Sequence, residues 1–181
     1  MHALTNKELR RLLEAARAHR ERDWLMILVA FNHGLRASEI TGFTAAAVRD
    51  GHLTVQRLKG SLKTTQPLIE SDDPLLSEKD ALQKFARRAR LGRPVFNISR
   101  FQFWRIVKKH ALSAGINAHL AHPHVLKHSV AKMSIRSAGI ENVRQFLGHK
   151  SLASTGAYLR VSDDEAARAV RAALFSSEQE K

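Results

Sequence analysis

The spacing of hydrophobic residues along most of the chain predicts helices. Leucine and alanine recur at helical spacing over residues 9–16, behind a capping pair formed by Thr5 and Glu8, which predicts a helix over residues 5–20. Similar spacing, with capping residues at the start and glycines at the end, predicts further helices over 22–33, 77–90, 99–114, 122–138, 140–147, after Ser151, and over 162–175.

Two short segments, 53–58 and 64–69, have the composition and alternation of β-strands. Residues 59–63 between them are short enough for a hairpin turn, in which Gly60 tolerates a positive φ. Pro67 cannot donate a ladder hydrogen bond, so its strand belongs at a sheet edge. The predicted fold class is mainly α with a small antiparallel β-hairpin.

Composition excludes several classes of protein. Hydrophobic residues make up 44% of the 181 residues, enough for a folded core, and the chain has no cysteine, which excludes a disulfide scaffold and a cysteine-ligated zinc site. The longest apolar run, 24–31, is too short to span a bilayer, and the first residues lack the apolar core of a signal peptide. We therefore expect a cytoplasmic, nucleoid-associated protein.

The charge pattern points to a polyanionic partner. The formal net charge is +13, and residues 81–140 contain 12 lysines and arginines without a single acidic residue. Mixed signs are usual on a merely soluble surface, so this acid-free segment favours contact with the phosphates of a polyanion, most often a nucleic acid. The candidate DNA-binding residues are Lys84, Arg87, Arg88, Arg100, Arg105, Lys108 and Lys109.

Three short segments carry candidate chemistry. They read GLRASEI at 34–40, HPHVLKHS at 122–129 and LGHKSLASTGAY at 147–158, and a lysine-bearing hairpin lies between the first two. In this order and spacing they resemble the tyrosine recombinase (phage integrase) family. The hairpin, with R-L-K followed by T-T-x-P-L, is also similar to that of the short recombinases of fimbrial phase variation.

The resemblance implies the fold of the tyrosine recombinase catalytic domain over residues 1–161. It also implies that the helix and tail at 162–181 dock either on a neighbouring protomer or back on their own domain. Most family members carry another DNA-binding domain before the catalytic one. We expect a stand-alone catalytic domain, and a fragment of a longer integrase is the alternative.

The resemblance also assigns roles in the first half of the chain. Arg36 would hold non-bridging oxygens of the scissile phosphate, as a planar guanidinium can do with two parallel hydrogen bonds. Glu39 would support Arg36 without reacting. The hairpin lysine, which would protonate the departing 5′-hydroxyl, falls on Lys59, with Lys63 as the competing candidate.

In the second half, the resemblance places His124 and His149 among the groups that stabilise the phosphate, with His128 in support. Lys127 stands where the family has its second arginine. Lysine keeps the positive charge but cannot clamp two oxygens at once. Tyr158, the only tyrosine in the chain, takes the position of the nucleophile that forms a 3′-phosphotyrosyl link.

A metal site is the alternative interpretation of the histidines. His119, His122, His124 and His128 lie within ten residues, but no carboxylate is near in sequence and Lys127 would sit among the ligands. We therefore predict no metal, and no cofactor, since transesterification conserves the energy of the phosphodiester bond.

The function predicted from these observations is site-specific DNA recombination (integration, excision or inversion) by a tetramer on DNA. Three alternatives remain open from the sequence. One is a DNA-binding regulatory protein on the same fold, with weak or no strand cleavage because of Lys127. The others are a type IB topoisomerase and a helical regulator without chemistry.

Overall fold

The structure is a computed structural model that describes residues 2–57, 62–151 and 153–156. Its helices are α1 (Asn6–His19), α2 (Glu21–Asn32), α3 (Ala37–Ile40), α4 (Lys79–Arg88), α5 (Arg100–Ser113), α6 (Pro123–Ala138), α7 (Ile140–Phe146) and α8 (Ala153–Gly156), with 3-10 turns η1 (Ala45–Ala47) and η2 (Ala118–Leu120). The strands are β1 (Val48–Arg49), β2 (His52–Val55) and β3 (Thr64–Pro67). The mainly helical class with a small antiparallel sheet is confirmed.

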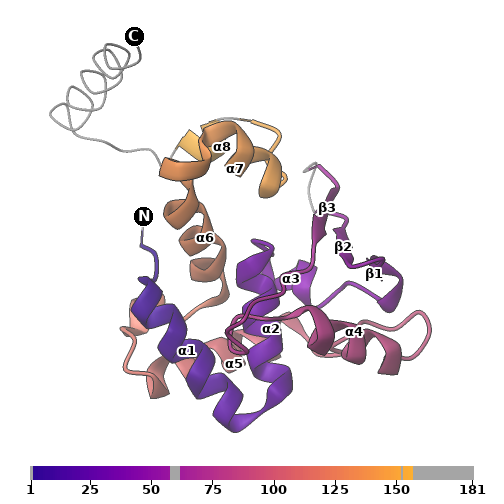
Figure 1. The fold of residues 1–181 in the computed structure, drawn as a ribbon. Coiled ribbons are helices and arrows are strands. Elements are labelled where there is room, and N and C mark those ends of the chain that lie inside the picture. The colour runs from indigo at the N-terminus through magenta and orange to yellow at the C-terminus, as the bar shows by residue number, and fades with distance from the viewer. Residues whose placement is uncertain (1, 58–61, 152, 157–181) are drawn as a thin grey trace, which may run out of the picture.

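Helices α1, α2, α5 and α6 pack together around the main hydrophobic core, and the sheet lies to one side of them (Figure 1). Most of α2 is buried because its residues from Asp23 to Ala30 are nearly all apolar and face neighbours on every side. The predicted capping pairs are present at two of these helices. Thr5 with Glu8 begins α1, and Ser99 with Gln102 begins α5.

The sheet has three antiparallel strands in the order β1-β2-β3, one more than predicted. β1 has only two residues, too few to show an alternating pattern in the sequence. β3 is an edge strand, as Pro67 required, and that residue pairs with His52. Regular pairing of β2 ends at Val55, so the strands are shorter than the predicted 53–58 and 64–69.

The predicted start of α4 at Ser77 is wrong by two residues. The hydroxyl of Ser77 instead accepts a hydrogen bond from the backbone N–H of Ser71. Glu78 is drawn into the core, where it pairs with the ring of His33, and the regular helix begins at Lys79. Tertiary contacts thus decide this boundary against the local capping preference.

Helix α6 carries α7 and α8 away from the bundle to the end of the molecule near the tip of β3 (Figure 1). A second, smaller core of Ala131, Ile135, Val143 and Leu147 joins α6 to α7. The site described below lies where this unit meets the main body. The predicted helix at 162–175 and the boundary at residue 161 lie outside the described residues. Among the helices that are described, none has the length and hydropathy needed to cross a membrane.

Candidate active site

Arg36 lies in the turn between α2 and α3, at the start of α3. Its backbone N–H donates to Oε2 of Glu39 (2.8 Å), and its guanidinium donates through Nη1 to Oε1 of the same carboxylate (3.0 Å). The Arg36 side chain remains 33% exposed whereas that of Glu39 is fully buried. Glu39 therefore holds the guanidinium from its buried side and leaves it accessible to solvent, and its supporting role in catalysis stays a prediction.

Glu39 is held as a carboxylate. Burial by itself would raise its pKa, but the Arg36 backbone N–H and the positive charges of Arg57 and Lys127 outweigh that effect and lower the pKa below its ordinary value. Arg57 reaches Oε2 of Glu39 through Nη1 at 3.1 Å, and both side chains of this ion pair are fully buried. One buried carboxylate thus anchors Arg36 and Arg57, and the charge of Lys127 on a third part of the chain also acts on it.

Lys127 lies on α6 and is 5% exposed. Its Nζ donates to the carbonyl of Leu147 at 3.1 Å, just past the end of α7. Burial first, and then the neighbouring charges of Arg36 and Arg57, lower the pKa of Lys127 to about 7. An ammonium carries three N–H donors, so after the bond to Leu147 it retains donors for another oxygen.

His149 follows the turn after α7 and is also buried. Its Nδ1 lies 2.9 Å from the hydroxyl of Thr155. Burial first, and then the positive charges of Lys127, Arg36 and Arg57, lower the pKa of His149 to about 4, so the ring is neutral at pH 7. When the Thr155 hydroxyl donates to Nδ1, the proton of the neutral ring sits on Nε2, where it can be offered to a phosphate oxygen.

The other predicted histidines line one face of α6. His124 is exposed, and its ring centroid lies 6.4 Å from those of both His122 and His128. His128 is half-buried, and burial followed by the charge of His124 lowers its pKa. Lys63 is exposed immediately before β3. Lys59 and Tyr158 lie outside the described residues, so the choice between the two hairpin lysines stays a prediction.

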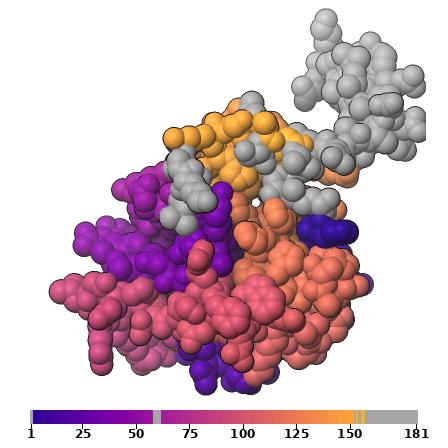
Figure 2. Space-filling model, turned by 180° about the vertical axis from the view of Figure 1, so that it is seen from behind, coloured from indigo at the N-terminus to yellow at the C-terminus, as the bar shows by residue number. Residues whose placement is uncertain are grey.

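The predicted DNA-binding residues are all exposed and lie on α4 and α5 (Lys84, Arg87, Arg88, Arg100, Arg105, Lys108 and Lys109). Seen from behind, the acid-free segment from α4 to α6 forms a continuous band across the lower part of the molecule (Figure 2). On α5, Phe101 and Trp104 are also exposed with their rings stacked, and Nζ of Lys108 lies 4.8 Å from the Trp104 ring centroid.

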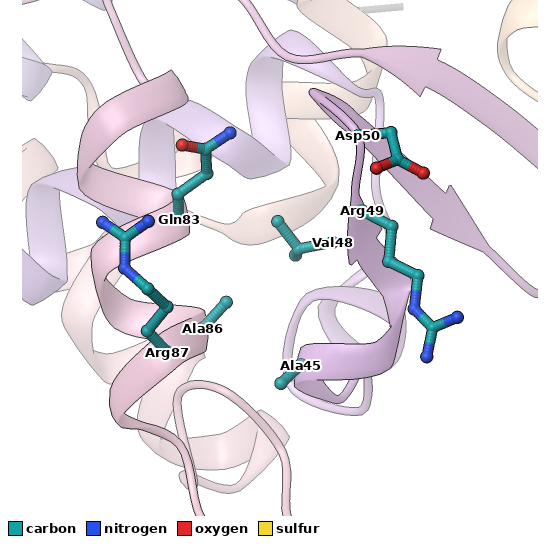
Figure 3. Close-up of a pocket in the computed structure, with 7 residues that line it drawn as sticks. All are labelled: Ala45, Val48, Arg49, Asp50, Gln83, Ala86 and Arg87. Atoms are coloured by element: carbon teal, nitrogen blue, oxygen red, sulfur yellow. The ribbon is translucent and has the colours of Figure 1, made fainter.

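A pocket of about 320 Å³ lies away from this chemistry, between α4 and the η1–β1 segment. Gln83, Ala86 and Arg87 line it from α4, and Val48 and Arg49 from β1 (Figure 3). The two guanidinium groups point away from each other on opposite sides of the hollow (Figure 3). The pocket contains none of the predicted catalytic residues, so we do not assign it to the active site.

His19, Asp23 and His110 form the one group of metal-ligand type found among the described residues. Asp23 Oδ2 lies 3.1 Å from His110 Nε2 and 3.7 Å from His19 Nδ1. However, the Arg22 guanidinium donates twice to Asp23 Oδ1, and Lys109 Nζ lies 2.8 Å from His19 Nε2. These two cations oppose a metal ion, and the cluster is explained as a hydrogen-bonded link between α2 and α5.

Arg57 and Thr155 contact the predicted site residues Glu39 and His149 but are not themselves among the residues predicted from the sequence. Arg57 does carry a signal: Leu53 and Val55 face inward along the same strand direction, so residue 57 continues the inward-facing series. A charged residue at such a position implies a buried partner. For Thr155 the sequence offers no comparable signal.

The depressed pKa of Lys127 predicts that stability rises with pH above neutrality. The unfolded chain keeps this proton up to the ordinary value of 10.5, whereas the folded protein releases it near pH 7, so the unfolded state binds more protons in that window. Lys127 should therefore contribute a rise of about 1.4 kcal/mol in unfolding free energy per pH unit between about pH 7 and 9. Urea unfolding at several pH values measures this rise.

Two lysine variants on the same helix isolate the effect of Lys127. Lys127→Met should remove the rise, whereas Lys132→Met, which replaces an exposed lysine of α6, should keep it. Equal slopes in the two variants would contradict the assignment of the low pKa to Lys127.

Comparison with curated proteins identifies relatives of the chain. Tyrosine recombinase XerA of Pyrococcus furiosus is 32% identical over 184 residues, which cover 94% of this chain and 61% of that protein. Type 1 fimbriae regulatory protein FimB of Escherichia coli K12 is 30% identical over 166 residues, covering 84% of this chain and 80% of that protein. The chain therefore spans about three fifths of the length of XerA and four fifths of that of FimB.

Solved structures share the fold. A crystal structure of XerA recombinase superposes with a TM-score of 0.72 at 19% identity, covering 100% of this chain and 64% of that one. The lambda integrase catalytic core gives 0.65 at 21% identity, covering 82% and 92%. A lambda integrase dimer bound to a COC′ core site gives 0.70 at 21% identity, covering 89% and 49%. The family model described as the phage integrase family matches residues 2–165, and the chain belongs to this family.

Proposed function

We propose that this protein is a site-specific DNA recombinase that cleaves and rejoins DNA through a 3′-phosphotyrosyl intermediate. The observation that carries the proposal is the electrostatic cluster of Arg36, Lys127 and His149. These residues come from the turn before α3, from α6 and from the turn after α7. The charge of Arg36 lowers the pKa of Lys127, and both charges lower the pKa of His149. Arg36 and Lys127 also both lower the pKa of Glu39. A cluster of cations and a neutral imidazole around one accessible guanidinium suits a phosphate group.

In the proposed reaction the Tyr158 hydroxyl gives up its proton to solvent, its oxygen attacks the scissile phosphorus, and the bond to the 5′-oxygen breaks. Arg36 and Lys127 stabilise the negative charge on the non-bridging oxygens, and His149 donates one hydrogen bond. The hairpin lysine, Lys59 or Lys63, gives a proton to the departing 5′-oxygen. The 5′-hydroxyl of a partner strand then attacks the phosphotyrosyl phosphorus. A new phosphodiester bond forms, the bond to the tyrosine oxygen breaks, and the tyrosine is released.

The proposed partner is double-stranded DNA, bound through the exposed basic residues of α4 and α5. Solved structures similar to this chain include a lambda integrase tetramer bound to a Holliday junction, which supports assembly of several protomers on DNA. Two duplexes must exchange strands, so four cleaving protomers are required. We therefore propose a homotetramer on DNA.

A DNA-binding regulatory protein on the same fold is the second candidate, and Lys127 is the observation that favours it. Its pKa of about 7 leaves the ammonium partly deprotonated at neutral pH, and a neutral amine stabilises a developing negative charge less than an ammonium does. A bound phosphate, however, restores the charged form by its own negative charge. We favour the recombinase because the remaining catalytic positions match the family pattern.

A nicked suicide substrate tests the proposal. Cleavage next to the nick releases a short fragment, so the phosphotyrosyl intermediate cannot be resealed and accumulates as a labelled covalent protein–DNA adduct. An adduct formed only on specific sites supports a recombinase. Relaxation of plasmid without site preference would favour a topoisomerase, and binding without any adduct would favour the regulatory protein.

The cleavage rate of Lys127→Met should fall roughly 10²–10³-fold below wild type, because the ammonium is a preorganised donor to the transition state. The adduct assay measures this rate, with Lys132→Met again serving as the matched control on α6. A Lys127→Met rate equal to wild type would show that the ammonium does not act on the phosphate.

A further inference from the structure

Arg57 lies just after β2 and has a fully buried side chain. A guanidinium has five N–H donors, and in this structure each of them has a protein acceptor. The acceptors are Thr64 Oγ1 for Nε (2.9 Å), the Gly34 carbonyl and Glu39 Oε2 for Nη1 (both 3.1 Å), and the His33 and Phe146 carbonyls for Nη2 (2.9 and 3.2 Å). No donor remains for a phosphate oxygen, so Arg57 does not act on DNA by contact.

The acceptors of Arg57 belong to three described segments near the catalytic residues: the turn that carries Arg36, the start of β3, and the end of α7. Gly34 and Glu39 flank Arg36 on either side, and Thr64 opens the strand that follows the hairpin lysine. Phe146 ends α7, three residues before His149. One buried side chain therefore connects the arginine turn, the hairpin and the turn that carries the histidine.

The turn after α7 depends on such donors because the last carbonyls of a helix lack partners within it. Phe146 O accepts from Arg57 and also from Gln66 Nε2 (2.7 Å). Leu147 O accepts from Lys127 Nζ, and Gly148 O accepts from the backbone N–H of Leu62 (3.1 Å). Three successive carbonyls are thus held by α6, the hairpin and Arg57, which fixes where the next residue, His149, lies.

Packing at Gly148 supports the same interpretation. Gly148 has φ +67°, and a Cβ at this position would lie 2.9 Å from Arg57 Cγ and 2.9 Å from the Leu62 carbonyl oxygen. The turn therefore approaches the arginine stem as closely as a glycine allows. This close fit leaves the turn little room to shift while Arg57 stays in place.

We infer that Arg57 is a positioning residue for strand cleavage, which sets the distance between Arg36, the start of β3 and His149 without touching the DNA. The inference rests on the proposed recombinase function. Displacement of reacting groups by about 1 Å can cost roughly 100-fold in rate, so loss of the five-way connection should slow cleavage by that order. Lysine cannot replace it, because an ammonium has three donors and no planar fork.

The test compares Arg57→Lys with wild type in single-turnover adduct formation on the nicked suicide substrate. We expect about a 100-fold slower rate, with the dissociation constant for DNA unchanged within about 3-fold. Leu12→Ala, a core variant within α1, serves as the control for lost stability. Arg49→Lys, at an exposed arginine of β1, serves as the control for the substitution itself.

A milder pair of variants keeps the test decisive if Arg57→Lys does not fold. Thr64→Val removes the acceptor of Arg57 Nε while preserving the shape of the side chain, and Thr64→Ser restores a hydroxyl. We expect cleavage to fall several-fold in the valine variant and to return close to the wild-type rate in the serine variant. Equal rates in the two Thr64 variants would count against the inference.

The pH dependence of cleavage gives a readout that lost stability alone would not move. The charged and titratable groups that interact electrostatically with Lys127 are Arg36, Glu39, Arg57, His128 and His149. Arg57→Met removes one cation from this set, so the pKa of Lys127 should rise and the pH above which cleavage declines should move upward. Leu12→Ala should leave the profile in place.

The outcomes separate this inference from the proposed function. No adduct with wild-type protein would overturn both. The role of Arg57 alone would be overturned by three results together. Wild type forms adducts, Arg57→Lys cleaves as fast as Leu12→Ala at equal folded fraction, and Arg57→Met has an unshifted pH profile. Slow cleavage with intact DNA binding and a shifted profile would establish it.

Discussion

Tyr158→Phe should abolish covalent protein–DNA adducts while leaving DNA affinity and the unfolding temperature close to wild type. Removing one hydroxyl eliminates the proposed nucleophile, and Tyr158 is the only tyrosine, so no other phenol can take its place. The surrounding cations should still bind the scissile phosphate. Denaturing electrophoresis with end-labelled suicide substrate measures the adduct directly.

Measuring DNA binding alongside adduct formation separates a loss of cleavage chemistry from a loss of DNA affinity. Gel shifts with the same labelled DNA should give equal dissociation constants for Tyr158→Phe and wild type. Adducts formed at the wild-type rate by the variant would show that a different residue attacks the phosphorus, and the proposed mechanism would be wrong.

DNA affinity should fall by about 10³-fold or more between about 50 and 200 mM salt if six or more phosphates are contacted. The reason is counterion release: each phosphate neutralised by lysine or arginine frees condensed cations, and added salt opposes that release. The seven exposed basic residues of α4 and α5 supply enough charges for such contacts. Fluorescence anisotropy over a salt series gives the slope of log affinity against log salt.

Single substitutions assign the slope to the proposed face. Arg105→Ala should weaken binding and reduce the magnitude of the slope by about one phosphate contact. Arg10→Ala is the matched control, because Arg10 is an exposed arginine of α1 paired with Asp73 and lies outside the acid-free segment. A slope near zero for wild type, or the same loss in both variants, would contradict binding through this face.

Much of the fold follows from local sequence. Helices α1 and α5 begin at the predicted capping pairs because a hydroxyl and a carboxylate or amide, three residues apart, satisfy backbone groups within a single turn. Helix α6 begins at Pro123 and ends before Gly139, whose φ of +79° disfavours other residues. These signals need no information from distant residues, so the sequence suffices to predict them.

The prediction of Arg36, Glu39 and His149 as site residues rests on the family resemblance of three motifs in a fixed order. Arg36 and Glu39, which contact each other, are three residues apart and lie within one turn of the chain. The burial of Lys127 could not be predicted, because it depends on the carbonyl of Leu147, which is twenty residues away and lies just past the end of α7.

Tertiary structure alone decided the features that connect the motifs. Ser77 reads as a helix cap, yet the burial of Glu78 against His33 moves the start of α4 to Lys79. Arg57 reads as one more basic residue of a hairpin, yet its acceptors lie between 7 and 89 residues away along the chain. Local patterns determine which residues can form a helix or bear a charge. Which charge is buried, and what it holds in place, is determined only when distant carbonyls and carboxylates need partners in a core that excludes water.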